Sequence, residues 1–280
     1  MPGREDRVVA PVDARDVEPM VDADIIAELG DRSLPRQSIS THGPRWSRVV
    51  LKMSGEALAG EGGQTIHAEV IERIASEIAM ARSDLGVEMA VMIGGGNIWR
   101  GTSPAGRCLD RSTSDTMGML ATVINALALQ DAIERHGQPT RVLSAIQMAE
   151  VAEPYIRRRA IRHLEKGRVV IFAAGMGNPY FTTDTPAALR AAEIEAEVLL
   201  KGTHSGVDGV YSADPKLDPK ATRFDEITFM EVVRKSLRVM DLTAITFCRD
   251  NALPVLVFDL TRPGNITRAL RGEELGTLIK

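Results

Sequence analysis

The chain has 280 residues, enough for one large domain or one domain with a tail, and 44% of them are hydrophobic, which allows a substantial core. The net charge of −4 argues against nucleic acid as the main ligand, because binding to a phosphate backbone needs a basic surface. No apolar run approaches the length of a membrane span and the first residues lack the apolar core of a signal peptide, so we expect a cytoplasmic protein without membrane contact.

Residues 1–46 are interpreted as a tail. Up to Pro44 the sequence contains no lysine and is dense in Asp, Glu, Arg and Pro. Apolar residues at positions 21, 25, 26 and 29 predict one short amphipathic helix that ends near Gly30. The remainder of the tail is expected to be flexible. The domain that carries the function would therefore span 47–280.

Strands and helices alternate from Ser47 onward. The predicted strands cover residues 48–53, 87–93, 140–146, 168–174, 197–200 and 254–258, with a last one at Thr277. The predicted helices cover residues 70–84, 112–136, a segment ending at 166–167, 184–195, two stretches within 227–251, and 266–271. This alternation predicts an α/β fold, a three-layer αβα sandwich with a mostly parallel central sheet.

Three of the predicted strand ends are rich in glycine, at residues 52–55, 94–97 and 174–178. Ligands of such sheets bind outside the carboxyl ends of the strands, and glycine lets a phosphate oxygen approach backbone N–H groups closely. Lys52 lies at the first turn and would offer phosphate a compact positive charge. Arg100 lies just after the second turn, and its guanidinium could donate two hydrogen bonds to one phosphate. The sequence therefore predicts a polyphosphate site at this edge.

Two common nucleotide-binding motifs are absent. The chain contains no Gly-Lys dipeptide, which excludes a Walker A loop. The second glycine turn reads Gly-Gly-Gly-Asn-Ile-Trp, with Trp99 where a dinucleotide fingerprint needs its third glycine. A Rossmann dehydrogenase is accordingly disfavoured, and the phosphate chemistry belongs to a different scaffold.

A series of segments resembles the motifs of bacterial UMP kinases, which have the amino acid kinase fold. The similarity runs in order from about Arg48 to Lys280, and the tail lies outside it. The matching segments are LKMSGEAL at 51–58, IGGGN at 93–97, RG at 100–101, DTMGMLAT at 115–122, GNPYFTTD at 177–184, VDGVY at 207–211, DP at 214–215, VMD at 239–241 and GTLI at 276–279. One departure is the stretch 201–206, which is about two residues longer than the common family form.

The resemblance implies an enzyme of pyrimidine nucleotide biosynthesis that transfers the γ-phosphoryl group of ATP to UMP, giving UDP and ADP. Its catalytic residues would be Lys52 and Arg100. Its ATP-binding residues would be Lys52, Met53, Ser54, Gly55, Gly96, Arg100, Thr203, Tyr211 and Asp214. Of these, the last three would line the adenine and ribose pocket. Its UMP-binding residues would be Gly95, Asp115, Met176, Gly177, Asn178, Pro179, Tyr180, Phe181, Thr182 and Thr183, with the carboxylate of Asp115 on the ribose hydroxyls.

The resemblance also implies Mg²⁺ as a cofactor that enters with ATP, held mainly by ATP oxygens and water, and no dedicated protein metal site. Asp184 or Asp214 would contact the ion through water. The implied partners are ATP and UMP, with an allosteric homohexamer that GTP activates and UTP inhibits. The segment 60–65 matches an effector loop in length, whereas Gln130 and Glu134 stand where some members carry basic residues.

Alternative functions remain open at this point. One is a kinase of the same fold that acts on a carboxylate or carbamate, although the segment 178–183 together with Asp115 favours UMP. Another is a non-catalytic nucleotide sensor or storage protein, against which Lys52 and Arg100 argue. Several site residues also have structural interpretations: Asp115 could complement a helix dipole, residues 182–184 could cap a helix, and Asp214-Pro215 could form a turn.

Overall fold

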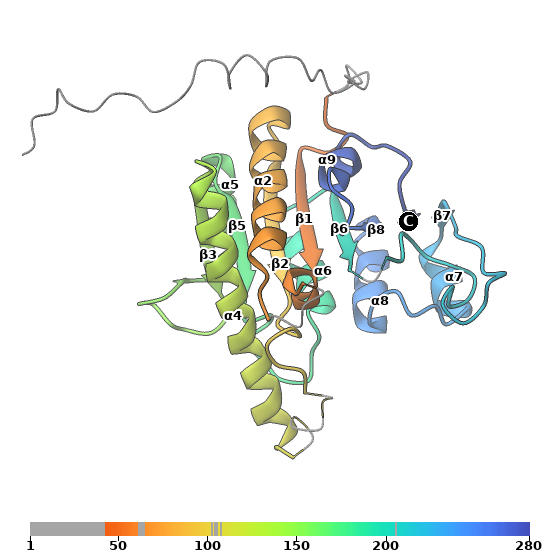
Figure 1. Ribbon diagram of the computed structural model, residues 1–280, viewed down its shortest axis with the longest axis horizontal. Coiled ribbons are helices and arrows are strands. Elements are labelled where there is room, and N and C mark those ends of the chain that lie inside the picture. The colour runs from red at the N-terminus through yellow and green to blue at the C-terminus, as the bar shows by residue number, and fades with distance from the viewer. Residues whose placement is uncertain (1–42, 61–64, 102, 104–105, 107, 205) are drawn as a thin grey trace, which may run out of the picture. The chain divides into compact units, whose positions relative to one another are not determined.

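The computed structural model describes residues 43–60, 65–101, 103, 106, 108–204 and 206–280 (Figure 1). The helix expected near positions 21–29 and most of the tail lie outside these residues. Arg45 and Trp46, which the sequence placed at the end of the tail, are described. The Arg45 N–H donates to the Leu270 carbonyl at 2.8 Å, and Trp46 is only 8% exposed within the core.

In the described part of the chain, nine strands form one sheet in the order β4-β3-β5-β2-β1-β6-β8-β9-β7. Every neighbouring pair is parallel except β8 and β9, which confirms the mostly parallel sheet. The strands are β1 (Arg48–Met53), β2 (Glu88–Ile93), β3 (Thr140–Ser144), β4 (Glu153–Pro154), β5 (Val169–Ala173), β6 (Val198–Thr203), β7 (Glu226–Ile227), β8 (Val255–Asp259) and β9 (Thr277–Ile279).

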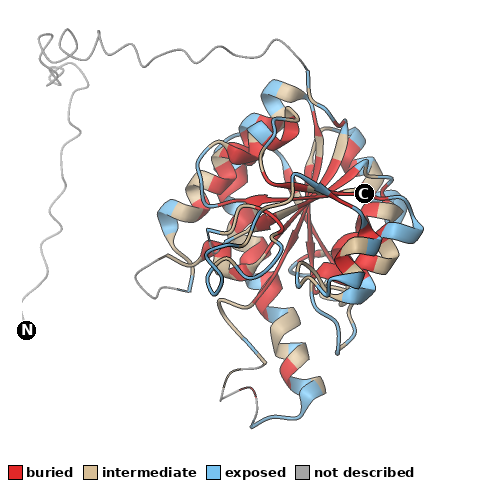
Figure 2. Ribbon diagram, turned by 90° about the vertical axis from the view of Figure 1, so that its right-hand side faces the viewer, coloured by how far each residue is buried: buried red, intermediate tan, exposed pale blue. Residues whose placement is uncertain are grey.

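Helices cover both faces of the sheet, which confirms the three-layer αβα sandwich (Figure 1). One face packs against α2 (Ala68–Leu85), α4 (Arg111–Arg135) and α9 (Asn265–Leu270). The other face packs against α5 (Arg157–Glu165), α6 (Asp184–Glu193), α7 (Phe229–Arg234) and α8 (Leu242–Asp250). A short 3₁₀ helix, η1 (Gly55–Leu58), follows β1 directly. In Figure 2 the buried residues lie along the strands and the inner faces of the helices, and the exposed ones lie outside.

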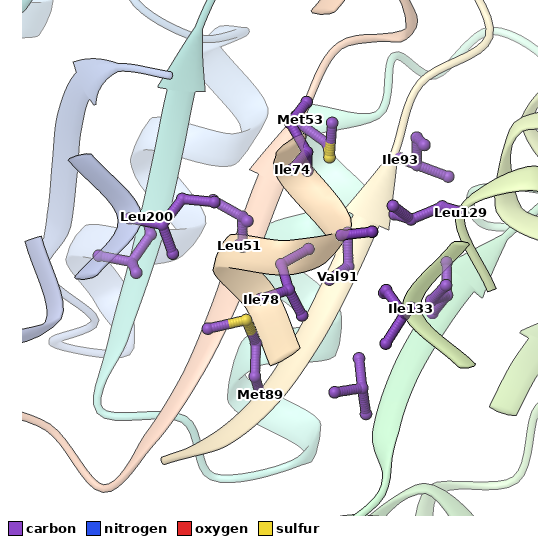
Figure 3. Close-up of a cluster of buried hydrophobic side chains, with 14 of the residues drawn as sticks. Leu51, Met53, Ile74, Ile78, Met89, Val91, Ile93, Leu129, Ile133 and Leu200 are labelled. Atoms are coloured by element: carbon purple, nitrogen blue, oxygen red, sulfur yellow. The ribbon is translucent and has the colours of Figure 1, made fainter. Parts of the chain in front are cut away.

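The central strands alternate between the two faces, as the period of two along a strand requires. Leu51 and Met53 of β1 join the core beneath α2, where Figure 3 shows them beside Ile74 and Ile78. Val50 points to the opposite face. Lys52 has the same parity as Val50, so its side chain lies on the face that α6 covers. A lysine therefore occupies a buried position near the carboxyl end of a central strand.

Helix α4 is, among the described residues, long and apolar enough to cross a membrane by length and composition alone. In this fold 44% of its apolar stretch is buried, and Val123, Ala126 and Leu129 belong to the hydrophobic core. The helix is accounted for as a core element.

The order of the strands creates the position for a ligand. From β1 the chain moves to β2 on one side, and after β5 it returns to place β6 on the other side of β1. The loops at the carboxyl ends of these strands diverge at such a switch point and leave a crevice there.

Candidate active site

A cavity of about 500 Å³ lies at the carboxyl ends of β1, β2 and β5, next to the first turns of α4. Its wall brings together most of the residues that the sequence predicted. These are Lys52, Ser54, Gly55, Gly95, Gly96, Arg100, Asp115, Met176, Asn178, Phe181, Thr182 and Thr183.

Two of the glycine turns pack backbone against backbone. The Gly94 N–H donates to the Met53 carbonyl at 2.9 Å, which ties the turn after β2 to the end of β1. A Cβ atom on Gly55 would lie 2.8 Å from the Gly96 nitrogen and 2.9 Å from the Gly94 oxygen, so a larger residue cannot fit without a shift of backbone. Below the turn, the buried Asn125 amide donates to the Gly94 carbonyl at 2.8 Å. The two turns thus form one closely packed floor of the cavity, here called the glycine floor.

The third glycine turn follows β5 and contains several left-handed residues. Gly177 has φ +78°, and a Cβ atom there would lie 2.9 Å from the Ala145 oxygen. Tyr180 has φ +74°, an uncommon value for an aromatic residue. Its backbone N–H is held by the Asp115 carboxylate at 2.7 Å. Such outliers persist where surrounding contacts fix them, often at ligand sites.

Two lysines and one aspartate form a buried ion cluster beneath the cavity. The Nζ of Lys52 lies 2.6 Å from Asp184 Oδ1, and the Nζ of Lys201 lies 2.9 Å from Oδ1 and 3.1 Å from Oδ2. Lys52 and Lys201 are direct register partners on the adjacent strands β1 and β6, and Asp184 opens α6 on the same face. The aspartate fixes both ammonium groups at the carboxyl edge of the sheet.

Burial and charge shift the pKa values within this cluster. Burial alone would raise the pKa of Asp184, but the charges of Lys52 and Lys201 outweigh it and lower this pKa to about 2. Burial and the neighbouring charge of Lys52 lower the pKa of Lys201 to about 8, although Asp184 opposes the shift. Lys201 therefore sits close to its titration range at physiological pH.

Two further ion pairs border the cavity. Arg100 contacts the Glu56 carboxylate; burial would raise the pKa of Glu56, but a backbone hydrogen bond and Arg100 lower it. On the opposite side, Arg111 Nε donates to Asp115 Oδ2 at 2.7 Å. Asp110 caps α4 through the N–H groups of residues 112 and 113, so Asp115 is not its cap. Both arginines carry a carboxylate partner in this state.

A second cavity of about 490 Å³ contains the residues predicted for adenine and ribose, and Lys201 also lines it. The Thr203 hydroxyl lies 2.5 Å from the Val207 carbonyl, and the Tyr211 hydroxyl donates to Asp208 at 2.7 Å. Asp214 accepts from the Lys216 N–H, so its structural interpretation as a turn residue also holds. Because Lys52 lines the first cavity and Lys201 the second, the lysine pair stands between them.

Four predicted residues do not line either cavity. Met53 is fully buried in the core, so its side chain cannot contact ATP, and its carbonyl already accepts from Gly94. Gly177, Pro179 and Tyr180 lie in the turn after β5 but outside the cavity wall. Their contribution is to shape the turn.

The structure brings to the site four residues to which the sequence analysis assigned no role. These are Glu56, Lys201, His204 and Asp241, of which the first and last lie in matching segments of the resemblance. Lys201 did leave a signal, because Val198-Leu199-Leu200-Lys201 repeats the pattern of Val49-Val50-Leu51-Lys52 on the neighbouring strand. Asp241 accepts from the hydroxyls of Thr182 and Thr185 at 2.5 and 2.8 Å, which links the turn after β5 to the start of α8. No local pattern marks that contact.

Comparison with known proteins places the chain in context. Residues 47–259 match the amino acid kinase family. The fold is similar to that of UMP kinase from Bacillus anthracis, with 41% identity, a TM-score of 0.81, and coverage of 84% of this chain and 96% of that one. UMP kinase from Ureaplasma parvum shares 38% identity, with a TM-score of 0.79 and coverage of 84% and 99%. Uridylate kinase from Archaeoglobus fulgidus shares 30% identity, with a TM-score of 0.63 and coverage of 83% and 99%.

Proposed function

Because this chain belongs to the amino acid kinase family, we propose that it is a UMP kinase, which transfers the γ-phosphoryl group of ATP to the 5′-phosphate of UMP. The observation that carries the proposal is the first cavity. There Lys52, Arg100 and the glycine floor line the same cavity as Asp115 and most of the segment 176–183. A phosphate donor and a nucleotide acceptor could meet in that space.

The two cavities suggest where each substrate binds. Adenine and ribose would occupy the second cavity, beside Thr203, Tyr211 and Asp214. The triphosphate would then cross the lysine pair and end over the glycine floor. UMP would occupy the far side of the first cavity, its ribose toward Asp115 and its phosphate toward Thr182.

The chemistry needs no general base. The second pKa of a phosphate monoester is about 6, so the attacking oxygen of UMP is already anionic at pH 7. The transition state spreads negative charge over the transferred group, so positioning and positive charge supply the rate enhancement. In this chain Lys52, Lys201 and Arg100 would supply that charge.

Magnesium would enter as MgATP. Both oxygens of Asp184 already accept from the two lysines, so a contact of this carboxylate with the ion would pass through water. Within the described residues no three His, Cys, Asp or Glu side chains are grouped to hold a metal. We propose that ATP oxygens and water hold most of the ion's coordination shell, as is usual for Mg²⁺ bound with a nucleotide.

A coupled assay of ADP release tests the proposal directly. Purified protein and MgATP are offered UMP, CMP, aspartate and acetylglutamate in parallel. We expect ADP formation that depends on UMP. Turnover with aspartate or acetylglutamate alone would instead support a carboxylate kinase of the same fold, and binding of ATP without any turnover would support a nucleotide sensor.

The lowered pKa of Lys201 predicts that kcat/KM decreases on the basic side of its pH profile. Since the lysine loses its charge above a pH of about 8 in the free enzyme, kcat/KM should fall by about tenfold per pH unit beyond that point. Lys201→Arg keeps the charge at all these values, so its profile should stay flat to about pH 9.5 even if its activity at pH 7 is lower. Identical profiles of the two proteins would exclude Lys201 as the titrating group.

The titration of Lys201 should also make the folded protein more stable as pH rises above about 8. The folded pKa of about 8 lies below the unfolded value of 10.5, so charged Lys201 costs stability at neutral pH, and this cost is removed as pH rises from about 8 to 10.5. Lys201→Arg should lack that gain in thermal unfolding experiments.

If the Asp115 carboxylate accepts hydrogen bonds from the ribose of UMP, the enzyme should discriminate against deoxyribose substrates. A charged hydrogen bond contributes roughly 1.5–3 kcal/mol, so wild type should prefer UMP to 2′-deoxy-UMP or 3′-deoxy-UMP by about 10- to 150-fold in kcat/KM. Asp115→Ala should lose most of that preference while the KM for ATP changes much less, in a double-mutant cycle with the ligand as one partner.

A matched control lies on the same helix. Asp131 is exposed and pairs with Arg135, far along α4 from the cavity, so Asp131→Ala should retain the ribose preference. If Asp115→Ala also discriminates as strongly as wild type, the ribose binds elsewhere and the acceptor pocket must be redrawn around residues 176–183.

Assembly and regulation form a separate part of the proposal. We infer from the family a homohexamer in the cytoplasm that GTP activates and UTP inhibits. Residues 61–64 of the segment suggested as an effector loop lie outside the described residues. Light scattering would measure the oligomer, and initial rates with each nucleotide would measure the two effects.

A further inference from the structure

His204 lies at the border of the first cavity, immediately after β6. Its Nδ1 is 2.8 Å from the Ser54 hydroxyl, and its ring helps to line the wall that also contains Lys52 and Arg100. The side chain is exposed rather than packed in the core. A histidine in this position lines the same cavity as the glycine floor, where the proposed function puts the donor phosphates.

The charges already present at the site are largely neutralised. Arg100 pairs with Glu56, Arg111 pairs with Asp115, and the two lysines share Asp184. These seven described side chains carry only about one net positive charge, whereas a donor triphosphate and an acceptor phosphate are together strongly anionic. Histidine is the side chain that can gain a positive charge near neutral pH when anions arrive.

We propose that His204 is a further donor-site residue, which takes up a proton as MgATP binds and then contacts its phosphates as an imidazolium. The inference rests on the proposed function, because it needs a polyphosphate over the glycine floor. In the imidazolium both ring nitrogens carry a proton, so Nε2 would donate a hydrogen bond to a phosphate oxygen while Nδ1 stays beside the Ser54 hydroxyl.

The surroundings of the free protein favour a neutral ring. The cavity wall shields part of the exposed His204 from water, and this partial desolvation lowers the pKa of the ring below its usual 6.5. Glu56 of η1 raises the pKa, and the charges of Lys52, Arg100 and Lys216 lower it further. A bound triphosphate would reverse this balance by screening the three cations. The pKa would then rise, and between the free and bound values the affinity for MgATP must fall as pH rises.

Isothermal titration calorimetry measures this proton. A non-hydrolysable MgATP analogue is titrated at pH 7 in two buffers of different ionisation enthalpy, so that proton uptake is read from the difference in heat. We expect wild type to take up several tenths of a proton more per nucleotide than His204→Gln. His204→Lys, which is already charged, should also show no extra uptake. His136→Gln, on the surface beside Glu72, is the matched control and should behave as wild type.

Affinity gives a second readout. At pH 6.5 His204→Gln should bind the analogue about 5- to 10-fold more weakly than wild type, and the gap should narrow at pH 8.5 as the wild-type ring becomes neutral. His204→Asn, whose amide can still reach Ser54, separates the loss of charge from the loss of that hydrogen bond. If this variant restores wild-type proton uptake, the role is structural and the proposal is wrong.

The results distinguish a failure of the proposed kinase function from a failure of the role proposed for His204. Wild type that neither binds the analogue nor phosphorylates UMP overturns the proposed function itself. An active wild type whose proton uptake equals that of His204→Gln overturns only the role of His204. Should the variants fail to fold, an NMR titration of the His204 ring in wild type decides: its pKa must rise when the analogue is added.

Discussion

Replacement of Asp184 by asparagine should lower kcat/KM by roughly 10³-fold or more. The substitution keeps the shape of the side chain but leaves Lys52 and Lys201, which are partners on adjacent strands, without their shared counterion. Two such ammonium groups repel each other, so one of them should lose its proton and both should move. The phosphates would lose a charge and its position together. Steady-state kinetics with MgATP and UMP measure the loss.

Stability provides an independent check on Asp184. Its pKa of about 2, against an ordinary value of 3.8, corresponds to about 2 kcal/mol of stabilisation. Because the folded pKa is depressed, this contribution is present above about pH 4 and is lost as pH falls toward 2. The difference in unfolding free energy between wild type and Asp184→Asn should shrink over that range.

Glu77 supplies the control for Asp184. Its carboxylate is also buried and also pairs with a cation, Arg73, but it lies on α2 away from the cavity. Glu77→Gln should lower the melting temperature and leave the kinetics of the folded protein unchanged. If Asp184→Asn behaves in the same way as Glu77→Gln, the ion cluster is only structural.

Removal of the Arg100 side chain should lower kcat/KM by roughly 10²-fold or more without loss of the fold. A charged group that contacts the transferred phosphoryl contributes about 3 kcal/mol in comparable sites. The side chain is 59% exposed, so its removal opens no cavity in the core. Kinetics of Arg100→Ala, with circular dichroism to confirm folding, measure the effect.

Two variants separate a role in catalysis from the ion pair with Glu56. Arg100→Lys should recover activity only in part, since a point charge cannot reproduce the bidentate fork. Glu56→Gln breaks the same ion pair from the other side. If the pair alone matters, Glu56→Gln should lose as much activity as Arg100→Ala, and wild-type kinetics in folded Arg100→Ala would remove Arg100 from the site.

Most of the regular structure could be predicted because its signals are local. The strand predicted for 48–53 coincides with β1, and the helix predicted for 112–136 differs from α4 by one residue at each end. Runs of aliphatic residues between glycines determine such elements with little outside help. The strands β4 and β7 were missed because two residues carry no periodicity, and only the neighbouring strand makes them strands.

The candidate site could be predicted only where chain neighbours create it. The glycine turns and Lys52 were recognised from short motifs, and the structure brings them to one cavity. The contact between Lys52 and Lys201 spans about half the chain and depends on the order and register of β1 and β6, which no local pattern reveals. The same holds for Asp241, which reaches the turn after β5 only because α8 packs beside α6.

The second cavity contains residues that were predicted for one part of the donor nucleotide. Thr203, Tyr211 and Asp214 were assigned to the adenine and ribose of ATP and Lys52 to its phosphates, and the two groups line different cavities. The loop after β6 reaches both cavities, because His204 lines the first and Val207 and Tyr211 line the second.

The titration of Lys201 has a consequence for covalent chemistry. With a pKa of about 8, roughly a quarter of its amines are uncharged at pH 7.5, against about one in a thousand for a lysine with the ordinary value of 10.5. An uncharged amine is a nucleophile, and this one lines the second cavity. An acylating group carried on a nucleotide-shaped body would therefore meet a reactive amine there, while lysines on the surface stay protonated and inert toward it.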